Sequence, residues 1–299
     1  MQSVGPNLVA PARKARLFAV LSAAVLCVIA AIPASASSQG IRYLALGDSV
    51  PFGFNPNLDP TNASNFVGYP EIVAQRLNIE DVNATCPGEA TGGFLSLTGT
   101  DNVCRQYRFQ FGLPLHVAYS GTQMAFATAY LRSHPTTRLV TLTLGANDIF
   151  RFQKDCATGP TFGTCPLGIA GVLGVMYQNL NTIFAGLRAT GYTGLIVALT
   201  YYSLDYSDTS GAIALNTPMI AAATGHGALV ASGLDAWAAT ANGGPSCAAG
   251  LLIINLTDGT CDVHPTPLGR DLLAGAVINA IAASCPAASP IGCLARNRA

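Results

Sequence analysis

A serine at the end of an apolar run is the first candidate for chemistry in this sequence. Residues 41–46 form a short, mostly apolar run, as expected for a buried parallel strand, and the run stops at Gly47-Asp48-Ser49. Open α/β sheets bind ligands at the carboxyl ends of their strands, so Ser49 is expected where a substrate binds. Its hydroxyl can act as a nucleophile if a base removes the proton and hydrogen-bond donors stabilise an oxyanion.

The other side chains that such a reaction needs are found later in the chain. Asn147 follows the apolar run 139–144, and a side-chain amide can donate a hydrogen bond to an oxyanion. His264 can act as the base, and Asp262, two residues before it, can orient the imidazole. These residue types predict acyl transfer on Ser49.

Four short blocks in this order resemble the SGNH (GDSL) hydrolase superfamily. The blocks are Gly47-Asp48-Ser49, Cys86-Pro87-Gly88-Glu89, Gly145-Ala146-Asn147-Asp148, and Asp262-Val263-His264-Pro265-Thr266 followed by Gly269. Together they span roughly residues 41–284. The resemblance implies a flavodoxin-like, three-layer α/β/α sandwich with a central parallel sheet, and a reaction that needs no metal or other cofactor.

The resemblance also implies a role for each matching residue. Ser49 is the expected nucleophile, and His264 is the expected base and then the acid for the leaving alcohol. The expected oxyanion hole consists of the backbone N–H groups of Ser49 and Gly88 and the side chain of Asn147. Asp262 is expected to fix the tautomer of the imidazole.

The position of the acid departs from the family pattern. In the family the acid commonly lies three residues before the histidine, where this chain has Cys261. We therefore predict Asp262 as the acid, with Asp258 or a backbone carbonyl as the alternatives.

Each candidate also has an ordinary structural interpretation. Ser49 can cap a helix, and Asn147 alone would be a common turn residue. Asp48 and Asp148 are expected to be structural. Only His264 has an acid nearby and a strand-to-helix loop around it, so structural or surface roles are expected for His116, His134 and His226.

The sequence pattern predicts one α/β domain over residues 37–299. Strands are predicted at 41–46, 81–84, 139–144, 195–199 and 251–256, and helices at 69–77, 123–133, 167–190, 212–241 and 267–284. Strands that alternate with helices indicate a parallel sheet covered on both faces. No internal repeat and no long linker divides the chain.

The first 36 residues are typical of a secretory signal peptide. Arg13, Lys14 and Arg16 precede a continuous apolar run at 17–32, which is followed by the small-residue site Ala34-Ser35-Ala36. No other segment reaches the ~18 uninterrupted apolar residues of a membrane span. We expect a secreted protein, extracellular or periplasmic, without a stable membrane anchor; an uncleaved N-terminal helix is the alternative.

Cysteine content supports an oxidising compartment. Of nine cysteines, Cys27 lies in the predicted leader, and the even number that remains suggests disulfides. Sequence proximity favours the local pairs Cys86–Cys104, Cys156–Cys165, Cys247–Cys261 and Cys285–Cys293. A zinc site is disfavoured because no spacing is Cys-x-x-Cys and no histidine lies at ligand spacing from a cysteine pair.

Composition limits the class of partner. Half of the residues are hydrophobic, only 10% are charged, and no basic patch suggests binding to nucleic acid. We expect a monomer that acts on a small-molecule or lipid ester, with the aromatic segments 150–152 and 201–202 lining either an acyl pocket or the core.

Two other functions remain open at this point. A carbohydrate acetylesterase would use the same fold, and a secreted binding protein would keep the fold without the chemistry. An α/β-hydrolase is disfavoured because the chain lacks that fold's Gly-x-Ser-x-Gly turn.

Overall fold

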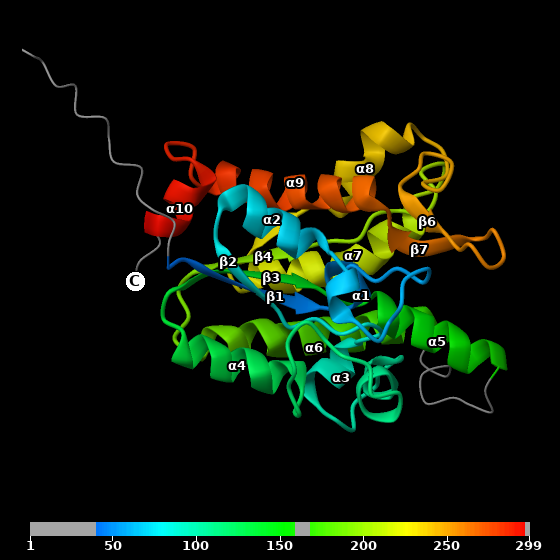
Figure 1. The fold of residues 1–299 in the computed structure, drawn as a ribbon, viewed down its shortest axis with the longest axis horizontal. Coiled ribbons are helices and arrows are strands. Elements are labelled where there is room, and N and C mark those ends of the chain that lie inside the picture. The colour runs from blue at the N-terminus through cyan, green and yellow to red at the C-terminus, as the bar shows by residue number, and fades with distance from the viewer. Residues whose placement is uncertain (1–39, 159–167, 297–299) are drawn as a thin grey trace, which may run out of the picture. The chain divides into compact units, whose positions relative to one another are not determined.

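A five-stranded parallel sheet lies at the centre of the described residues, 40–158 and 168–296 of the computed structural model (Figure 1). Its strands are β1 (Arg42–Gly47), β2 (Glu80–Asn83), β3 (Thr137–Thr143), β4 (Leu195–Leu199) and β5 (Leu229–Ala231). The strand order is β2-β1-β3-β4-β5, and every neighbouring pair is parallel. This is the flavodoxin-like order, so the predicted fold class is confirmed.

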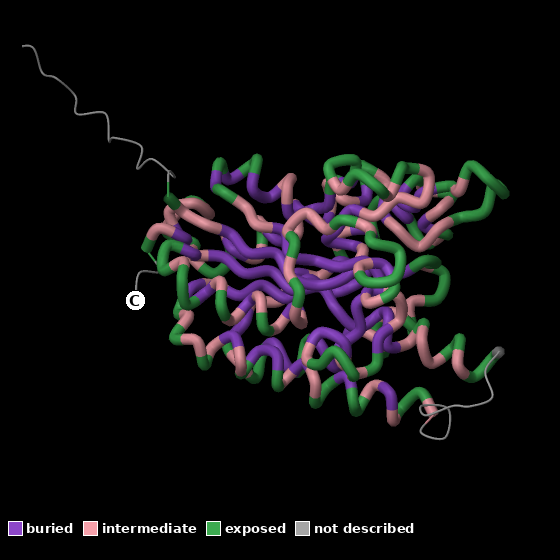
Figure 2. The backbone as a smooth tube through the Cα atoms, turned by 60° about the horizontal axis from the view of Figure 1, so that its bottom comes forward, coloured by how far each residue is buried: buried purple, intermediate pink, exposed green. Residues whose placement is uncertain are grey.

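Helices cover both faces of the sheet because alternate strand residues point to opposite sides. Tyr43 and Ala45 of β1 pack on one side with α2 (Tyr69–Leu77), α8 (Gly233–Ala241) and α9 (Pro267–Ser284). Leu44 and Leu46 pack on the other with α3 (Thr91–Leu95), α4 (Gln123–Ser133), α6 (Gly168–Arg188) and α7 (Ser210–Gly225). Figure 2 shows the strands as the buried layer of this sandwich.

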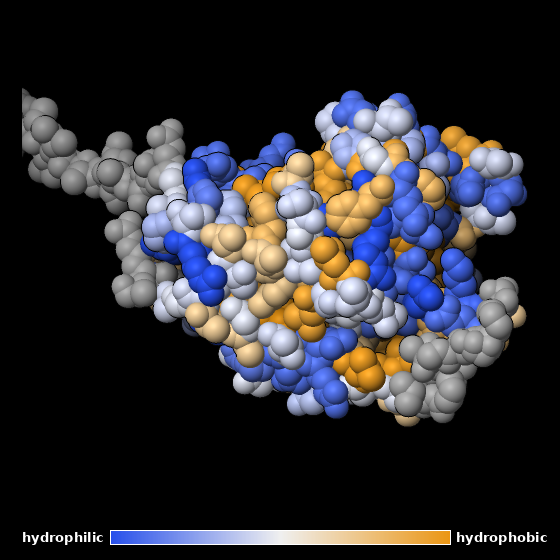
Figure 3. Space-filling view, turned by 90° about the horizontal axis from the view of Figure 1, so that it is seen from below, coloured by the Kyte–Doolittle hydropathy of each residue, from blue (hydrophilic) through white to orange (hydrophobic). Residues whose placement is uncertain are grey.

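Further elements complete the described fold. They are α1 (Ser49–Phe52), a 3₁₀ turn (Ala63–Asn65), a π-helical turn (Gln106–Gln110), α5 (Ala146–Thr158), β6 (Leu252–Ile254), β7 (Cys261–Pro265) and α10 (Pro290–Arg296). On the face with α3, α4 and α6, apolar side chains form separate patches among hydrophilic ones (Figure 3).

The predicted helices at 69–77, 123–133 and 267–284 are confirmed with the same bounds. The prediction of a mostly helical segment over 212–241 is wrong in part, because β5 lies between α7 and α8. This strand has only three residues, which is too short for an alternating pattern to reveal, and its pairing with β4 decides its conformation.

The prediction that 251–256 is a strand of the parallel sheet is also wrong. β6 pairs antiparallel with β7, and the two form a separate hairpin. Residues 261–265, predicted as loop, are the second strand of that hairpin. A short apolar run has the same pattern in a buried parallel strand and in a hairpin, so the sequence alone does not separate them.

Three of the favoured cysteine pairs are joined in the structure. Cys86 bonds to Cys104, Cys247 to Cys261, and Cys285 to Cys293, with Cα–Cα separations of 5.6, 6.1 and 5.7 Å. The fourth pair includes Cys165, which lies outside the described residues, as does the predicted signal peptide. None of the described helices is long and apolar enough to cross a membrane.

Candidate active site

Ser49 lies in the turn that connects β1 to α1. At Gly47 the backbone has φ +134°, and a Cβ there would lie 2.0 Å from the carbonyl oxygen of Thr143, so only glycine fits. Asp48 caps the following short helix, because its Oδ1 accepts a hydrogen bond of 3.0 Å from the backbone N–H of Val50. The turn therefore places Ser49 at the carboxyl edge of the sheet.

His264 reaches Ser49 from the β6–β7 hairpin. Its Nε2 lies 2.8 Å from the Oγ of Ser49, although 215 residues separate the two in the chain. The other ring nitrogen, Nδ1, is hydrogen-bonded to Oδ1 of Asp262, and the same oxygen accepts from the backbone N–H of His264 at 2.9 Å. The structure thus brings the predicted nucleophile, base and acid into one chain of hydrogen bonds.

Strand geometry explains how Asp262, two residues before His264, can bond to its side chain. In an extended strand residues i and i+2 share a face, so Asp262 and His264 of β7 point to the same side. Cys261 lies on the alternate side and bonds to Cys247. Asp258, the alternative acid, is fully exposed and accepts hydrogen bonds from the backbone and hydroxyl of Thr260 instead.

Contacts at both ends hold the hairpin in place. The side chain of Asn57 donates to the carbonyl of Ile254 at 2.8 Å and accepts from the N–H of Leu256 at 2.9 Å. Near the histidine, the hydroxyl of Tyr202 donates to the carbonyl of Val263 at 2.6 Å. Together with the disulfide at Cys261, these contacts fix the strand that carries the imidazole.

Asn147 lies near Ser49 because the strand that precedes it is the neighbour of β1. It follows β3, and the carboxyl ends of adjacent parallel strands meet at one edge. Its Nδ2 donates a hydrogen bond of 3.4 Å to Oδ2 of Asp48, which also accepts from the hydroxyl of Tyr201. The sequence predicted Asn147, whereas nothing in the sequence pattern indicated the contact of Tyr201.

Gly88 lies in a tight turn, as predicted from its block, with φ +80°. A Cβ at this position would lie 2.5 Å from the Cβ of Val103. Its carbonyl accepts from the backbone N–H groups of Asn102 and Val103 at 3.2 Å. Gly88 does not line the cavity that contains Ser49, and its role as an oxyanion donor stays a prediction.

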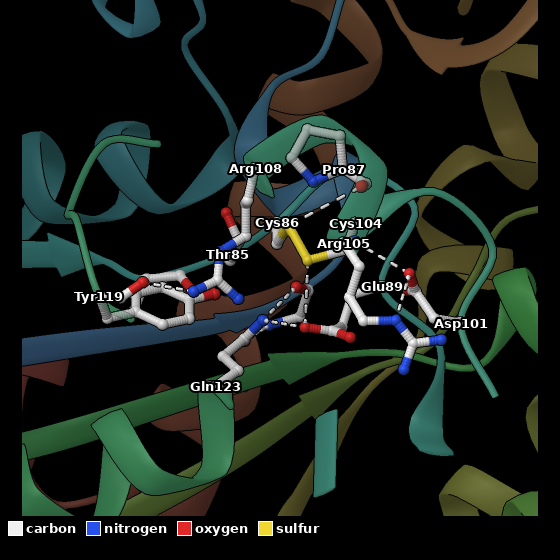
Figure 4. Close-up of a disulfide and its surroundings, with 12 residues drawn as sticks. Thr85, Cys86, Pro87, Glu89, Asp101, Cys104, Arg105, Arg108, Tyr119 and Gln123 are labelled. Carbon is white, nitrogen blue, oxygen red and sulfur yellow. Dashed lines mark hydrogen bonds and ion pairs between the residues drawn. A yellow bond between two sulfur atoms is a disulfide. The ribbon is translucent and has the colours of Figure 1, made fainter. Parts of the chain in front are cut away.

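A buried polar cluster contacts the turn that carries Ser49. The side-chain amide of Gln123 accepts from the N–H of Gly47 at 2.5 Å and donates to its carbonyl at 2.9 Å. Its Nε2 also lies 3.4 Å from Glu89, which Figure 4 shows next to the Cys86–Cys104 disulfide. Sequence reasoning missed Gln123, since its helical segment carries no sign of a partner in β1.

The same cluster contains the one candidate group of metal ligands among the described residues, Cys86, Glu89 and Cys104. Both sulfurs are joined in a disulfide and therefore offer no thiolate to a metal. The other histidines bond elsewhere: His116 to the carbonyl of Phe52 and His226 to the side chain of Asn181.

Three carboxyl groups near the site are buried, and burial raises the pKa of each. The pKa of Asp48 rises to about 6, and so does that of Asp148, although hydrogen bonds from Tyr201 and Thr91, respectively, oppose the shift. Burial also raises the pKa of Glu89 well above its usual range. The native state therefore binds protons at these positions more tightly than the unfolded chain does.

We expect the free energy of unfolding to fall as pH rises from 4.5 to 7.5. Each native carboxyl with a pKa near 6 must lose a proton that it holds more tightly than the unfolded chain, which costs up to about 3 kcal/mol per group. Urea unfolding across this range measures the effect, and Asp148→Asn should flatten the profile. Stability that rises with pH over this range would contradict the sign.

A cavity of about 480 Å³ opens beside the nucleophile and is mostly apolar. Ser49, Asn147 and His264 lie at one part of its lining. The remaining wall comes largely from α5, from the first turns of α6 and from the 201–215 segment, with the apolar residues Ile149, Phe150, Ile169, Leu173, Tyr201, Tyr202, Leu204, Ala212 and Leu215. Pockets of this size and character bind small molecules.

Comparison with known proteins gives one family match. Residues 45–272 match the model of the GDSL-like lipase/acylhydrolase family, a range that contains Ser49, Gly88, Asn147 and His264. No curated protein sequence matches the chain.

Solved structures with the same fold share little sequence with this chain. The enzyme LAE5, an α/β hydrolase from the metagenome of Lake Arreo in Spain, is 17% identical with a TM-score of 0.52, over 85% of this chain and 96% of that one. Phospholipase A1 from Streptomyces albidoflavus is 20% identical with a TM-score of 0.51, over 80% and 98%. An acetyl-xylooligosaccharide esterase from Geobacillus is 16% identical with a TM-score of 0.50, over 81% and 94%. At these identities the likeness shows the fold.

Proposed function

The chain belongs to the GDSL-like lipase/acylhydrolase family, and we propose that it is a secreted serine esterase or lipase that cleaves carboxylic esters. The observation that carries this proposal is the hydrogen-bonded series Ser49–His264–Asp262 at the wall of an apolar cavity. The leader-like N-terminus and the disulfides support export.

The proposed reaction begins with transfer of the Ser49 hydroxyl proton to Nε2 of His264 while Oγ attacks the ester carbonyl carbon. Asp262 accepts the Nδ1–H of the imidazolium and stabilises its charge. Negative charge on the carbonyl oxygen is stabilised by the side-chain Nδ2 of Asn147 and by the N–H groups of Ser49 and Gly88.

Collapse of the tetrahedral intermediate breaks the bond to the alcohol, which leaves with the proton from Nε2. The acyl group stays on Oγ of Ser49. A water molecule then gives a proton to His264 and attacks the acyl carbon. When the second tetrahedral intermediate collapses, the bond from the acyl carbon to Oγ breaks, Oγ of Ser49 takes the proton back from Nε2, and the carboxylic acid is released.

The character of the cavity supports an apolar acyl group. Its wall of aliphatic and aromatic side chains stabilises methylene groups, each worth about 0.8 kcal/mol when buried. A carbohydrate acetylesterase would need polar groups for the sugar hydroxyls, and the cavity offers a few, such as Gln153, Asp205 and Asp208, in a wall that is mostly apolar. The likeness to the acetyl-xylooligosaccharide esterase shows the fold.

Hydrolysis of p-nitrophenyl esters of increasing chain length, with acetyl-xylan in parallel, tests this function. We expect steady turnover, with kcat/KM that rises up to about fourfold per methylene from acetate onward until the cavity is filled. A fluorophosphonate should transfer its phosphonyl group to Oγ of Ser49, with loss of fluoride, and abolish the rate, and Ser49→Ala should not react.

Other results would favour the alternatives. Faster deacetylation of xylan than of any acyl ester would support the carbohydrate esterase. Ester binding without turnover or phosphonate labelling would support the secreted binding protein.

A further inference from the structure

Asn102 contacts both residues that are proposed to complete the oxyanion hole. Its side-chain Nδ2 donates a hydrogen bond of 2.9 Å to Oδ1 of Asn147. Its backbone N–H donates to the carbonyl of Gly88 at 3.2 Å. Gly88 and Asn147 come from different strand ends and lie 59 positions apart in the printed sequence, so Asn102 links two otherwise separate parts of the site.

The segment that carries Asn102 is itself held in place. Arg151 lies one turn after Asn147 on α5, and its Nη1 donates to the carbonyl of Asp101 at 2.9 Å. The carboxylate of Asp101 accepts from the backbone N–H of Arg105 at 2.9 Å, and the disulfide between Cys86 and Cys104 closes the loop (Figure 4). The segment that carries Asn102 is therefore held by α5 through Arg151 and by the Cys86–Cys104 disulfide.

The two polar atoms of the Asn147 amide have different partners, a donor for the oxygen and an acceptor for the nitrogen. The Nδ2 of Asn102 can only donate, so it requires the oxygen of Asn147. Above about pH 6 the Asp48 carboxylate is ionised and can only accept, so it requires the nitrogen of Asn147. Together the two contacts favour the amide orientation in which Nδ2 of Asn147 faces Asp48, the residue before Ser49, and Oδ1 faces Asn102.

We propose that Asn102 is a positioning residue, which orients the Asn147 amide so that its nitrogen faces the developing oxyanion. This inference rests on the proposed esterase function and deepens it. A donor aligned before the reaction stabilises the oxyanion without reorganisation, whereas an inverted amide would present an oxygen to it. Asn102 acts through Asn147 and does not itself touch the substrate.

The variant Asn102→Asp tests this orientation, because a carboxylate of the same size only accepts hydrogen bonds and favours the inverted amide. We expect kcat for a soluble p-nitrophenyl ester to fall ~10²–10³-fold, as for loss of an oxyanion donor, with KM changed less than twofold. Asn102→Ala removes the donor without attracting the wrong end, so its loss should be about tenfold or less. The pH profile and the thermal midpoint should follow those of the wild type.

A double variant separates positioning from other effects. In an Asn147→Ala background, Asn102→Asp should lower kcat no further, whereas a direct effect of the new charge would persist. Gln106→Glu adds the same charge to an exposed position four residues away and should keep wild-type kcat. If Asn147→Ala loses activity but Asn102→Asp does not, or if the two losses add, the positioning role is overturned while the esterase stands. A wild-type protein that hydrolyses no ester overturns the proposed function itself.

Discussion

The variants Ser49→Ala and His264→Ala are each expected to lower kcat/KM by ~10⁵–10⁶, and the double variant is expected to lose no more than either one. In the proposed mechanism the two residues act as a unit, because the proton that leaves Oγ passes to Nε2, which lies 2.8 Å away. When either atom is missing, the remaining one has no function in the attack. Residual catalysis would come from the oxyanion donors and from substrate binding.

Steady-state hydrolysis of a p-nitrophenyl ester by the three purified variants measures this coupling. His134→Ala is a matched control, because that histidine bonds to the carbonyl of Tyr130 and to Ser133 on α4. It should keep wild-type kcat/KM. Losses that multiply in the double variant would mean that the serine and the histidine act independently, and the proposed proton transfer would be wrong.

The sequence was sufficient to predict residues that lie at strand ends. Ser49 and Asn147 follow apolar runs that are long enough to identify, and parallel strands bring their carboxyl ends to one edge. Asp262 and His264 were predicted from their spacing in the chain. The strand that places them on one face was not predicted, because the hairpin depends on β6 and on the disulfide at Cys261.

The sequence did not predict the residues of other elements that support the site. Gln123 binds the backbone of Gly47 across 76 positions, and Tyr201 binds Asp48 across 153. Neither type nor spacing marks such residues, since the amide and hydroxyl become meaningful only after the chain has folded. The same is true of Asn102, which lies outside every predicted strand and helix.

The length of a strand also limited the sequence prediction. β5 has three residues, and its apolar side chains are continuous in pattern with the helices on either side. Its parallel pairing with β4, between Val197 and Leu229 and the two positions that follow, supplies the hydrogen bonds that a helix would otherwise have provided. Pairing over long sequence distances is not visible in a local hydrophobic period.

Asp262→Asn is expected to lower kcat ~10⁴-fold while the fold stays intact. The carboxylate accepts both the backbone N–H and the Nδ1–H of His264, which leaves a lone pair on Nε2 for the proton of Ser49. An asparagine can instead donate to Nδ1, which moves the ring proton to Nε2 and stops that nitrogen from acting as the base. The loss should appear in kcat, because the substrate cavity is unchanged.

The charge of Asp262 in the wild type is the basis of this prediction. Burial alone would raise the pKa of Asp262, but the hydrogen bond and the charge of His264 outweigh it and lower that pKa. The carboxylate therefore stays ionised at mildly acidic pH and remains an acceptor for the Nδ1–H of His264.

Asp258→Asn is the matched control for Asp262→Asn. It makes the same chemical change four residues earlier on an exposed side chain that binds only Thr260. Rates for the two variants from pH 5 to 9, with circular dichroism to verify folding, decide which carboxylate orients His264. A wild-type rate in Asp262→Asn, or a comparable loss in Asp258→Asn, would move the acid to another group. The two-residue spacing to the histidine would then have no catalytic meaning.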